Sequence, residues 1–308
     1  MRDAEYDKKR VVKYLAWTFI LAYLVQAGVW LLYKNGQPMI GQAVMAVMMF
    51  IPALGVLLSG GKFSGMGWIP QFRKNWKSIL TAWFGPTLLA AAGAALYFLI
   101  FPGHFDLSGS YLTASAGPEV LEQMVAKGIS YPVYVLIGVL GCLTYAPLMN
   151  TFIALGEEIG WRGFLYPQLK AKFGRRKAWI IGGIIWGAWH WPLIWLIGYE
   201  YGAAAGNTIG YWGFPVSGML LFCFFTVSTG ILCDHLCERS GSIWLPSIFH
   251  GAINAAFTIP LSICLTNTGS ARLLGPAPNG IIAGLPLLAA AIWVCLRAGK
   301  EGSGQDGV

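Results

Sequence analysis

Long apolar segments separated by short polar ones run through almost the whole chain. Of its 308 residues, 56% are hydrophobic and only 11% are charged, and the mean hydropathy is +0.60. Soluble domains carry roughly a quarter charged residues. A helix needs roughly 20 residues to cross a bilayer core, where every backbone polar group must be satisfied internally. The sequence therefore predicts an all-α fold, a polytopic membrane helix bundle embedded in the lipid bilayer.

The apolar segments predict about eight transmembrane helices within a single membrane domain, residues 12–298. A cytoplasmic segment, 1–11, precedes this domain, and a Gly-rich flexible tail, 299–308, follows it. The first apolar run is too long for the core of a signal peptide, so we expect it to be retained. The polar segment 102–131 interrupts the pattern, and its stretch 118–126 is expected to form a short surface helix. The fourth span is expected to begin near residue 132 and to end in a pair of carboxylates.

The basic residues follow the predicted membrane topology. With eight spans and a cytoplasmic N-terminus, all but three of the 21 Lys and Arg residues fall on the cytoplasmic side. Such a bias is the positive-inside rule, and it places both termini in the cytoplasm of a protein that we expect in the plasma membrane. The net charge of +8 therefore reflects topology, and no nucleic acid partner is expected.

The stretch from Leu155 to Leu165 holds two adjacent carboxylates, although the chain has only 13 acidic residues. An ionisable group at membrane depth costs a few kcal/mol or more and usually marks a functional site. Glu158 and Arg162 are four residues apart and can form a salt bridge along one helix face. Glu157 lies about 100° round the helix and would be left free for chemistry. The alternative is an ordinary helix end with solvated charges.

Polar residues on two later spans are expected at a depth similar to that of Glu157. His190 lies on the fifth span, and His250 and Asn254 share one face of the seventh because they are four residues apart. A single buried histidine is more often a structural hydrogen-bonding group than a catalytic one. Polar residues on three spans that face the same compartment, however, must find partners or water within the bilayer. The obvious partners are one another.

Three ordered motifs in this chain resemble those of the CAAX prenyl endopeptidase type II family, also called CPBP or Abi. They are Glu157-Glu158-x-x-x-Arg162, an aromatic-x-x-x-His motif ending at His190, and His250-x-x-x-Asn254. The resemblance covers about residues 151–257. Trp186 stands where the family often has Phe, and it still supplies an aromatic side chain.

The resemblance implies an intramembrane endopeptidase acting on membrane-associated proteins or peptides, with its active site in the cytoplasmic half of the membrane. Glu157 and His190 would activate a water molecule, and a general base of this kind contributes roughly 100- to 10,000-fold. His250, in either protonation state, and Asn254 would stabilise the oxyanion. Glu158 and Arg162 would be structural.

Alternatives remain open at this point. Glu157, His190 and His250 could instead bind zinc as two histidines and a carboxylate with an open position for water. We favour a metal-free mechanism, because Asn254 is a poor zinc ligand but a good hydrogen-bond donor to an oxyanion. A non-catalytic scaffold or bacteriocin-immunity protein would keep the fold and bind a partner. A proton-coupled transporter is disfavoured because the sequence shows no inverted repeats.

Overall fold

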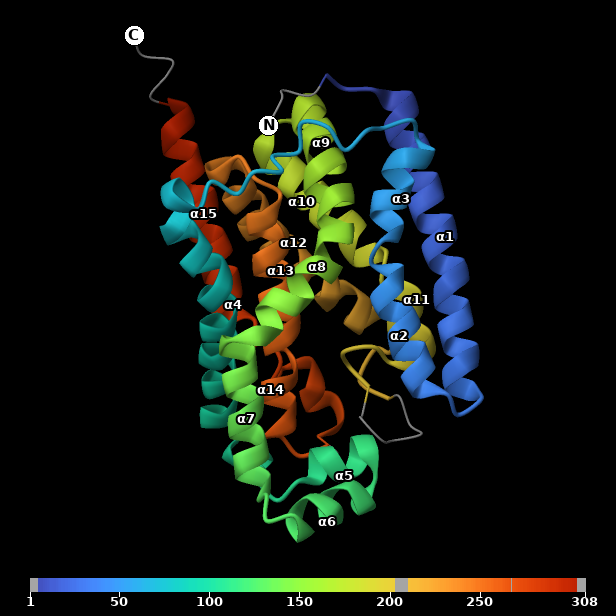
Figure 1. Ribbon diagram of the computed structural model, residues 1–308, viewed down its shortest axis with the longest axis vertical. Helices are drawn as coiled ribbons and strands as arrows, with labels where there is room; N and C mark the ends of the chain where they lie inside the picture. The colour runs from blue at the N-terminus through green and yellow to red at the C-terminus, as the bar shows by residue number, and fades with distance from the viewer. Residues whose placement is uncertain (1–4, 203–209, 267, 304–308) are drawn as a thin grey trace.

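The computed structural model describes residues 5–202, 210–266 and 268–303, and these residues form helices and no strand, which confirms the all-α class. Figure 1 shows the helices side by side in an elongated bundle. In chain order the helices are α1 (Lys8–Lys34), α2 (Pro38–Met48), α3 (Ile51–Leu58), α4 (Phe72–Ile100), η1 (Pro102–His104), α5 (Ser110–Ala116), α6 (Pro118–Ala126), α7 (Tyr131–Leu143), α8 (Tyr145–Gly160), η2 (Trp161–Leu165), α9 (Tyr166–Phe173), α10 (Arg175–Ala188), α11 (Trp191–Ile197), α12 (Val216–Ser240), α13 (Trp244–Ala256), α14 (Thr258–Ser262), η3 (Gly269–Leu273) and α15 (Leu285–Ser303).

Candidate membrane spans are fewer than the eight expected. By length and apolar composition, four helical segments of the described residues qualify: α1, α4, the α10–α11 stretch and α12. Two bent pairs, α2 with α3 at 41° and α6 with α7 at 95°, raise the number to six if each pair is one span. Pro52 lies in the first turn of α3, a position where proline is well tolerated. The preceding helix, α2, has already ended before this turn. The count of eight therefore remains a prediction.

The two ends of the bundle differ in what they carry. Figure 1 shows the start of α1, α9 and the last turns of α15 at one end, and α5 and α6 at the other. Helix α6 has the bounds expected for the short helix at 118–126. Helix α15 continues to Ser303, into the expected tail, and residues 304–308 of that tail lie outside the described residues.

Helix α8 lies in the middle of the bundle, and small residues let its neighbours approach closely. A Cβ atom added at Gly156 would lie 2.7 Å from the Met49 carbonyl oxygen, between α2 and α3. One added at Gly251 of α13 would lie 2.6 Å from the Thr151 nitrogen of α8. Both distances are too short for a side chain, so glycine is required for the backbones to meet. The packing brings α13, with its histidine, against the Glu157–Glu158 end of α8.

Candidate active site

Glu157 and Glu158 occupy the last turn of α8, which continues without a break into the single wide turn η2 and then α9. A π-helical turn such as η2 inserts an extra residue into the helix and is frequent at functional sites. Both carboxylates are almost completely buried, at 2% and 0% exposure. Each must therefore be hydrogen-bonded or paired to be tolerated there.

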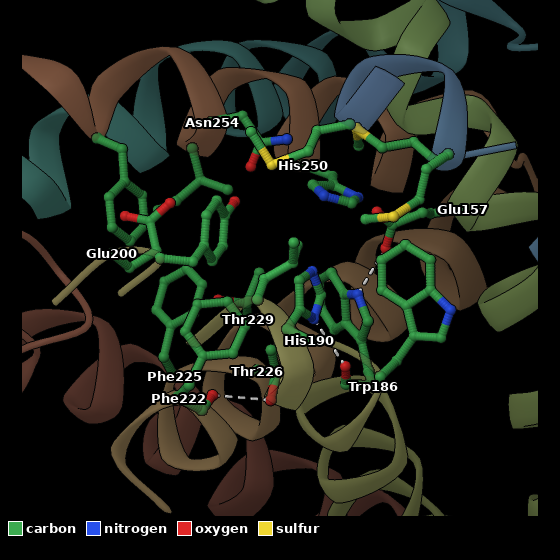
Figure 2. A pocket seen from close by; sticks show the side chains of 18 of the residues that line it. Glu157, Trp186, His190, Glu200, Phe222, Phe225, Thr226, Thr229, His250 and Asn254 are labelled. Atoms are coloured by element: carbon green, nitrogen blue, oxygen red, sulfur yellow. Dashed lines mark hydrogen bonds between the residues drawn. The ribbon is translucent and has the colours of Figure 1, made fainter. Parts of the chain in front are cut away.

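Two indole groups hold Glu157. The side-chain N–H of Trp161, one turn further along, donates to Glu157 Oε2 at 2.9 Å. The N–H of Trp186, on α10, donates to the same oxygen at 2.6 Å. This leaves Oε1 for a further donor such as water, while the two tryptophans fix the orientation of the carboxylate. Figure 2 shows the Trp186 contact.

Glu158 forms the expected salt bridge with Arg162, with 2.9 Å between Oε1 and Nη1. Both side chains are fully buried. The guanidinium also packs over the rings of Tyr166, at 4.7 Å, and Trp186, at 4.5 Å, in cation–π geometry. Because Trp186 also donates to Glu157, the arginine supports the orientation of both carboxylates.

Glu158 has a second partner that the spacing of the motif does not indicate. His250 Nδ1 lies 2.9 Å from Glu158 Oε1. A carboxylate accepts hydrogen bonds, so this contact assigns the proton to Nδ1 and leaves Nε2 as the second ring nitrogen. Nε2 then donates a hydrogen bond only when the ring is protonated. The sequence led us to expect that His250 can donate to an oxyanion in either protonation state. The geometry limits this to the protonated ring.

His190 follows α10 directly and begins the turn into α11, where Pro192 occupies the first turn. Its Nδ1 lies 3.0 Å from the carbonyl oxygen of Trp186. The carbonyl can only accept, so Nδ1 carries the proton and Nε2 has a free lone pair. In this tautomer, Nε2 of His190 can act as a general base or as a ligand to a metal ion.

One cavity of about 500 Å³ brings the four expected catalytic residues together: Glu157, His190, His250 and Asn254 all line it. Figure 2 shows them around the cavity, with Asn254 and His250 on the same helix. Asn254 is exposed to this space. Most of the remaining lining is apolar, from residues that include Met45, Leu193, Phe222, Phe225, Ile253 and Phe257.

A zinc ion would need at least three close ligands. Within the described parts of the chain, no group of three or more His, Cys, Asp or Glu side chains is placed to hold a metal ion. The metal-free mechanism stays a prediction, and we derive no catalytic step through a metal.

Sequence reasoning missed Glu200, which also lines the cavity. It follows α11 in a turn, outside the membrane-spanning helices. Burial raises the pKa of the Glu200 carboxyl to about 7, although a hydrogen bond from Tyr199 and the charge of Arg272 act in the opposite direction. The scarcity of acidic residues, which drew attention to Glu157, is a signal that applies equally to Glu200.

The fold and this pocket define an α-helical integral membrane protein with a buried polar and charged site inside the bundle. Residues 139–256 match the family model of the type II CAAX prenyl endopeptidase Rce1-like proteins. This region contains all three motifs in their expected order. This match supports the resemblance to the CPBP family that the three motifs indicate.

A curated relative gives a second comparison. The CAAX prenyl protease 2 of Methanococcus maripaludis is 26% identical over 181 residues. The aligned part covers 58% of this chain and 60% of that protein. The similarity therefore extends over about three fifths of each protein.

Proposed function

We propose that this chain is an intramembrane endopeptidase that hydrolyses peptide bonds of membrane-associated proteins or peptides. One observation carries the proposal: Glu157, His190, His250 and Asn254, from three separate helical regions, line a single cavity. The name of the curated relative, a CAAX prenyl protease, supports the reaction class. We extend to this chain only the hydrolysis of a peptide bond, and not the substrate of that relative.

In the proposed reaction, Glu157 Oε1 and His190 Nε2 polarise one water molecule. A proton passes from the water to this pair of side chains. The water oxygen then forms a bond to the carbonyl carbon of the scissile amide. The C–N bond then breaks, and the proton is delivered to the nitrogen, so that the products are a carboxylic acid and an amine. A fixed general base of this kind contributes roughly 100- to 10,000-fold to the rate.

The tetrahedral intermediate carries a negative charge on the former carbonyl oxygen. Asn254 donates an amide N–H to this oxyanion, and the protonated ring of His250 donates through Nε2. Loss of a donor of this type costs about 3 to 4 kcal/mol in the transition state. Glu158 accepts a hydrogen bond from His250 Nδ1 at 2.9 Å and so orients the ring toward the cavity.

We further propose that the end carrying α9 and the start of α1 faces the cytoplasm. The basic cluster of residues 170–177 lies in α9 and the start of α10, and Figure 1 shows this region at the same end as the first turn of α1. Positive residues next to spans favour the cytoplasmic side. The plasma membrane as the location is part of the same proposal.

The test is cleavage of a library of quenched fluorescent peptides by the detergent-purified protein, with and without a zinc chelator. We expect cleavage by the wild-type protein and by Glu119→Gln, whose carboxylate is exposed on α6. Glu157→Gln should fold normally but cleave at least 100-fold more slowly. Normal cleavage by Glu157→Gln would overturn the assignment of the base. Loss of cleavage on chelation, restored by zinc, would overturn the metal-free mechanism.

A further inference from the structure

Glu200 lies across the cavity from Glu157. Both residues line the same space, and Figure 2 shows the Glu200 carboxyl on the side opposite Glu157 and His190. The proposed hydrolytic reaction gives Glu200 no role. A second carboxylate at a distance from the reacting groups therefore needs its own explanation.

The backbone at Glu200 is strained. Its φ of +66° is in the left-handed region, which residues other than glycine, asparagine and aspartate rarely adopt. Such a conformation costs about 1 to 3 kcal/mol and persists only where the surrounding structure enforces it. Gly198, two residues earlier, ends α11 in the same region at no such cost. The tight turn thus places a glutamate at the wall of the cavity, although a glycine would adopt the same backbone conformation without strain.

Few protein groups offset the cost of burying the Glu200 carboxylate. Arg272 contributes a favourable charge, but its Nη2 donates to the carbonyl oxygen of Gly202 at 2.8 Å. Tyr199 supplies a hydrogen bond from the adjacent position. The other titratable side chains of the cavity, Glu157, His190 and His250, belong to the proposed catalytic group. A carboxylate in a largely apolar cavity needs a partner, and a cationic group of the ligand can supply one.

We propose that Glu200 forms an acidic subsite that binds a positively charged group of the peptide substrate, either a Lys or Arg side chain or a free α-amino group. This inference rests on the proposed function, because it assigns specificity within the same cavity. The peptide would lie between Glu157, where its scissile bond reacts, and Glu200, where its cation is held. Glu200 is therefore a specificity residue that touches substrate away from the reacting atoms.

Binding to a Glu157→Gln background separates recognition from cleavage. The probes are three matched fluorescent peptides: an N-acetylated peptide with one lysine, the same peptide with norleucine, and the norleucine peptide with a free amino terminus. We expect at least one cationic peptide to bind roughly 10-fold more tightly than the neutral one, as a charged hydrogen bond allows. The preferred peptide shows whether a side chain or an α-amine occupies the subsite.

Adding Glu200→Gln should abolish this preference while leaving affinity for the neutral peptide unchanged. Glu122→Gln, an exposed change on α6, should keep the preference. Equal affinity for cationic and neutral peptides on the Glu157→Gln background would overturn the proposal, as would a preference that survives Glu200→Gln. If selective binding is seen but the wild-type protein cleaves none of the peptides, the subsite is retained and the hydrolytic function fails.

A second measurement varies the pH on the Glu157→Gln background. Burial raises the pKa of the Glu200 carboxyl to about 7, so the ratio of lysine-peptide to norleucine-peptide affinities should rise as pH increases from 5.5 to 8.5, a range in which the lysine stays charged. His190 and His250 line the same cavity and also act on the cationic peptide, so only the part of the rise that disappears in Glu200→Gln is assigned to Glu200. A ratio that is flat or falls with pH would contradict the subsite.

Discussion

His250 Nδ1 lies 2.9 Å from Glu158 Oε1, and the same oxygen lies 2.9 Å from Arg162 Nη1. The second carboxylate of the pair thus positions the histidine of a helix 92 residues away in sequence. Glu158 is more than a partner for the arginine that follows it. It connects the end of α8 to α13 beside the cavity.

Glu158→Gln should reduce peptide cleavage roughly 10- to 100-fold, because hydrogen bonds to a charged group are worth about 1.5 to 3 kcal/mol. The amide keeps the shape of the side chain but removes the charge that accepts hydrogen bonds from His250 and Arg162. Steady-state kinetics across a pH series provide the measurement. An unchanged rate and pH profile would show that His250 works without Glu158.

Trp186→Phe should lower the cleavage rate about 10-fold with little loss of folded protein. The phenyl ring keeps an aromatic face over Arg162 but removes the N–H that donates to Glu157 at 2.6 Å. The matched control is Trp189→Phe, because the Trp189 N–H has no hydrogen-bond partner among the described residues. Both rates are measured on the same peptide, and an equal effect of the two substitutions would exclude a specific role for the Trp186 N–H.

Arg162→Leu should destabilise the protein by about 3 to 5 kcal/mol, because it leaves the fully buried Glu158 without its ion partner. Arg10→Leu is the comparison. Arg10 pairs with Asp7 at 3.6 Å, where both side chains are nearly half exposed, and such pairs contribute about 0 to 1 kcal/mol. Unfolding in detergent, monitored by tryptophan fluorescence, would measure the loss of stability in each variant. Similar losses would indicate that burial of the Glu158–Arg162 pair carries no special cost.

Asp106 should stabilise the loop between η1 and α5 in a pH-dependent way. Burial alone would raise its pKa, but hydrogen bonds from the hydroxyl and backbone N–H groups of Ser108 and Ser110 outweigh burial and lower the pKa. A lowered pKa in the folded state gives stability that is present above the unfolded value of about 3.9 and lost as pH falls through the folded value.

Asp106→Ala should therefore reduce the unfolding temperature at pH 6 and have a progressively smaller effect below pH 4. Thermal scans of both proteins across this range provide the test. Glu119→Ala, on the exposed face of nearby α6, serves as the control and should leave the unfolding temperature within error at each pH. A deficit in Asp106→Ala that is constant with pH would contradict the argument.

Much of the site could be predicted because its determinants are local. The four-residue spacing of Glu158 and Arg162 predicts their salt bridge, and the same spacing places His250 and Asn254 on one face of α13. The order of the motifs indicates the family. The two tryptophans that hold Glu157 were not predicted, because the direction in which an indole N–H points depends on how α8 and α10 pack.

The helical class, the polar residues inside apolar segments and the identity of the motifs are determined by the sequence itself, since hydrophobicity and helical periodicity act over a few turns. Only the tertiary structure decides which groups meet. The close approach of α13 to α8 at Gly251 brings His250 to Glu158, and the strained turn after α11 brings Glu200 to the cavity. These contacts join residues tens of positions apart, and they depend on packing between helices that local patterns do not encode.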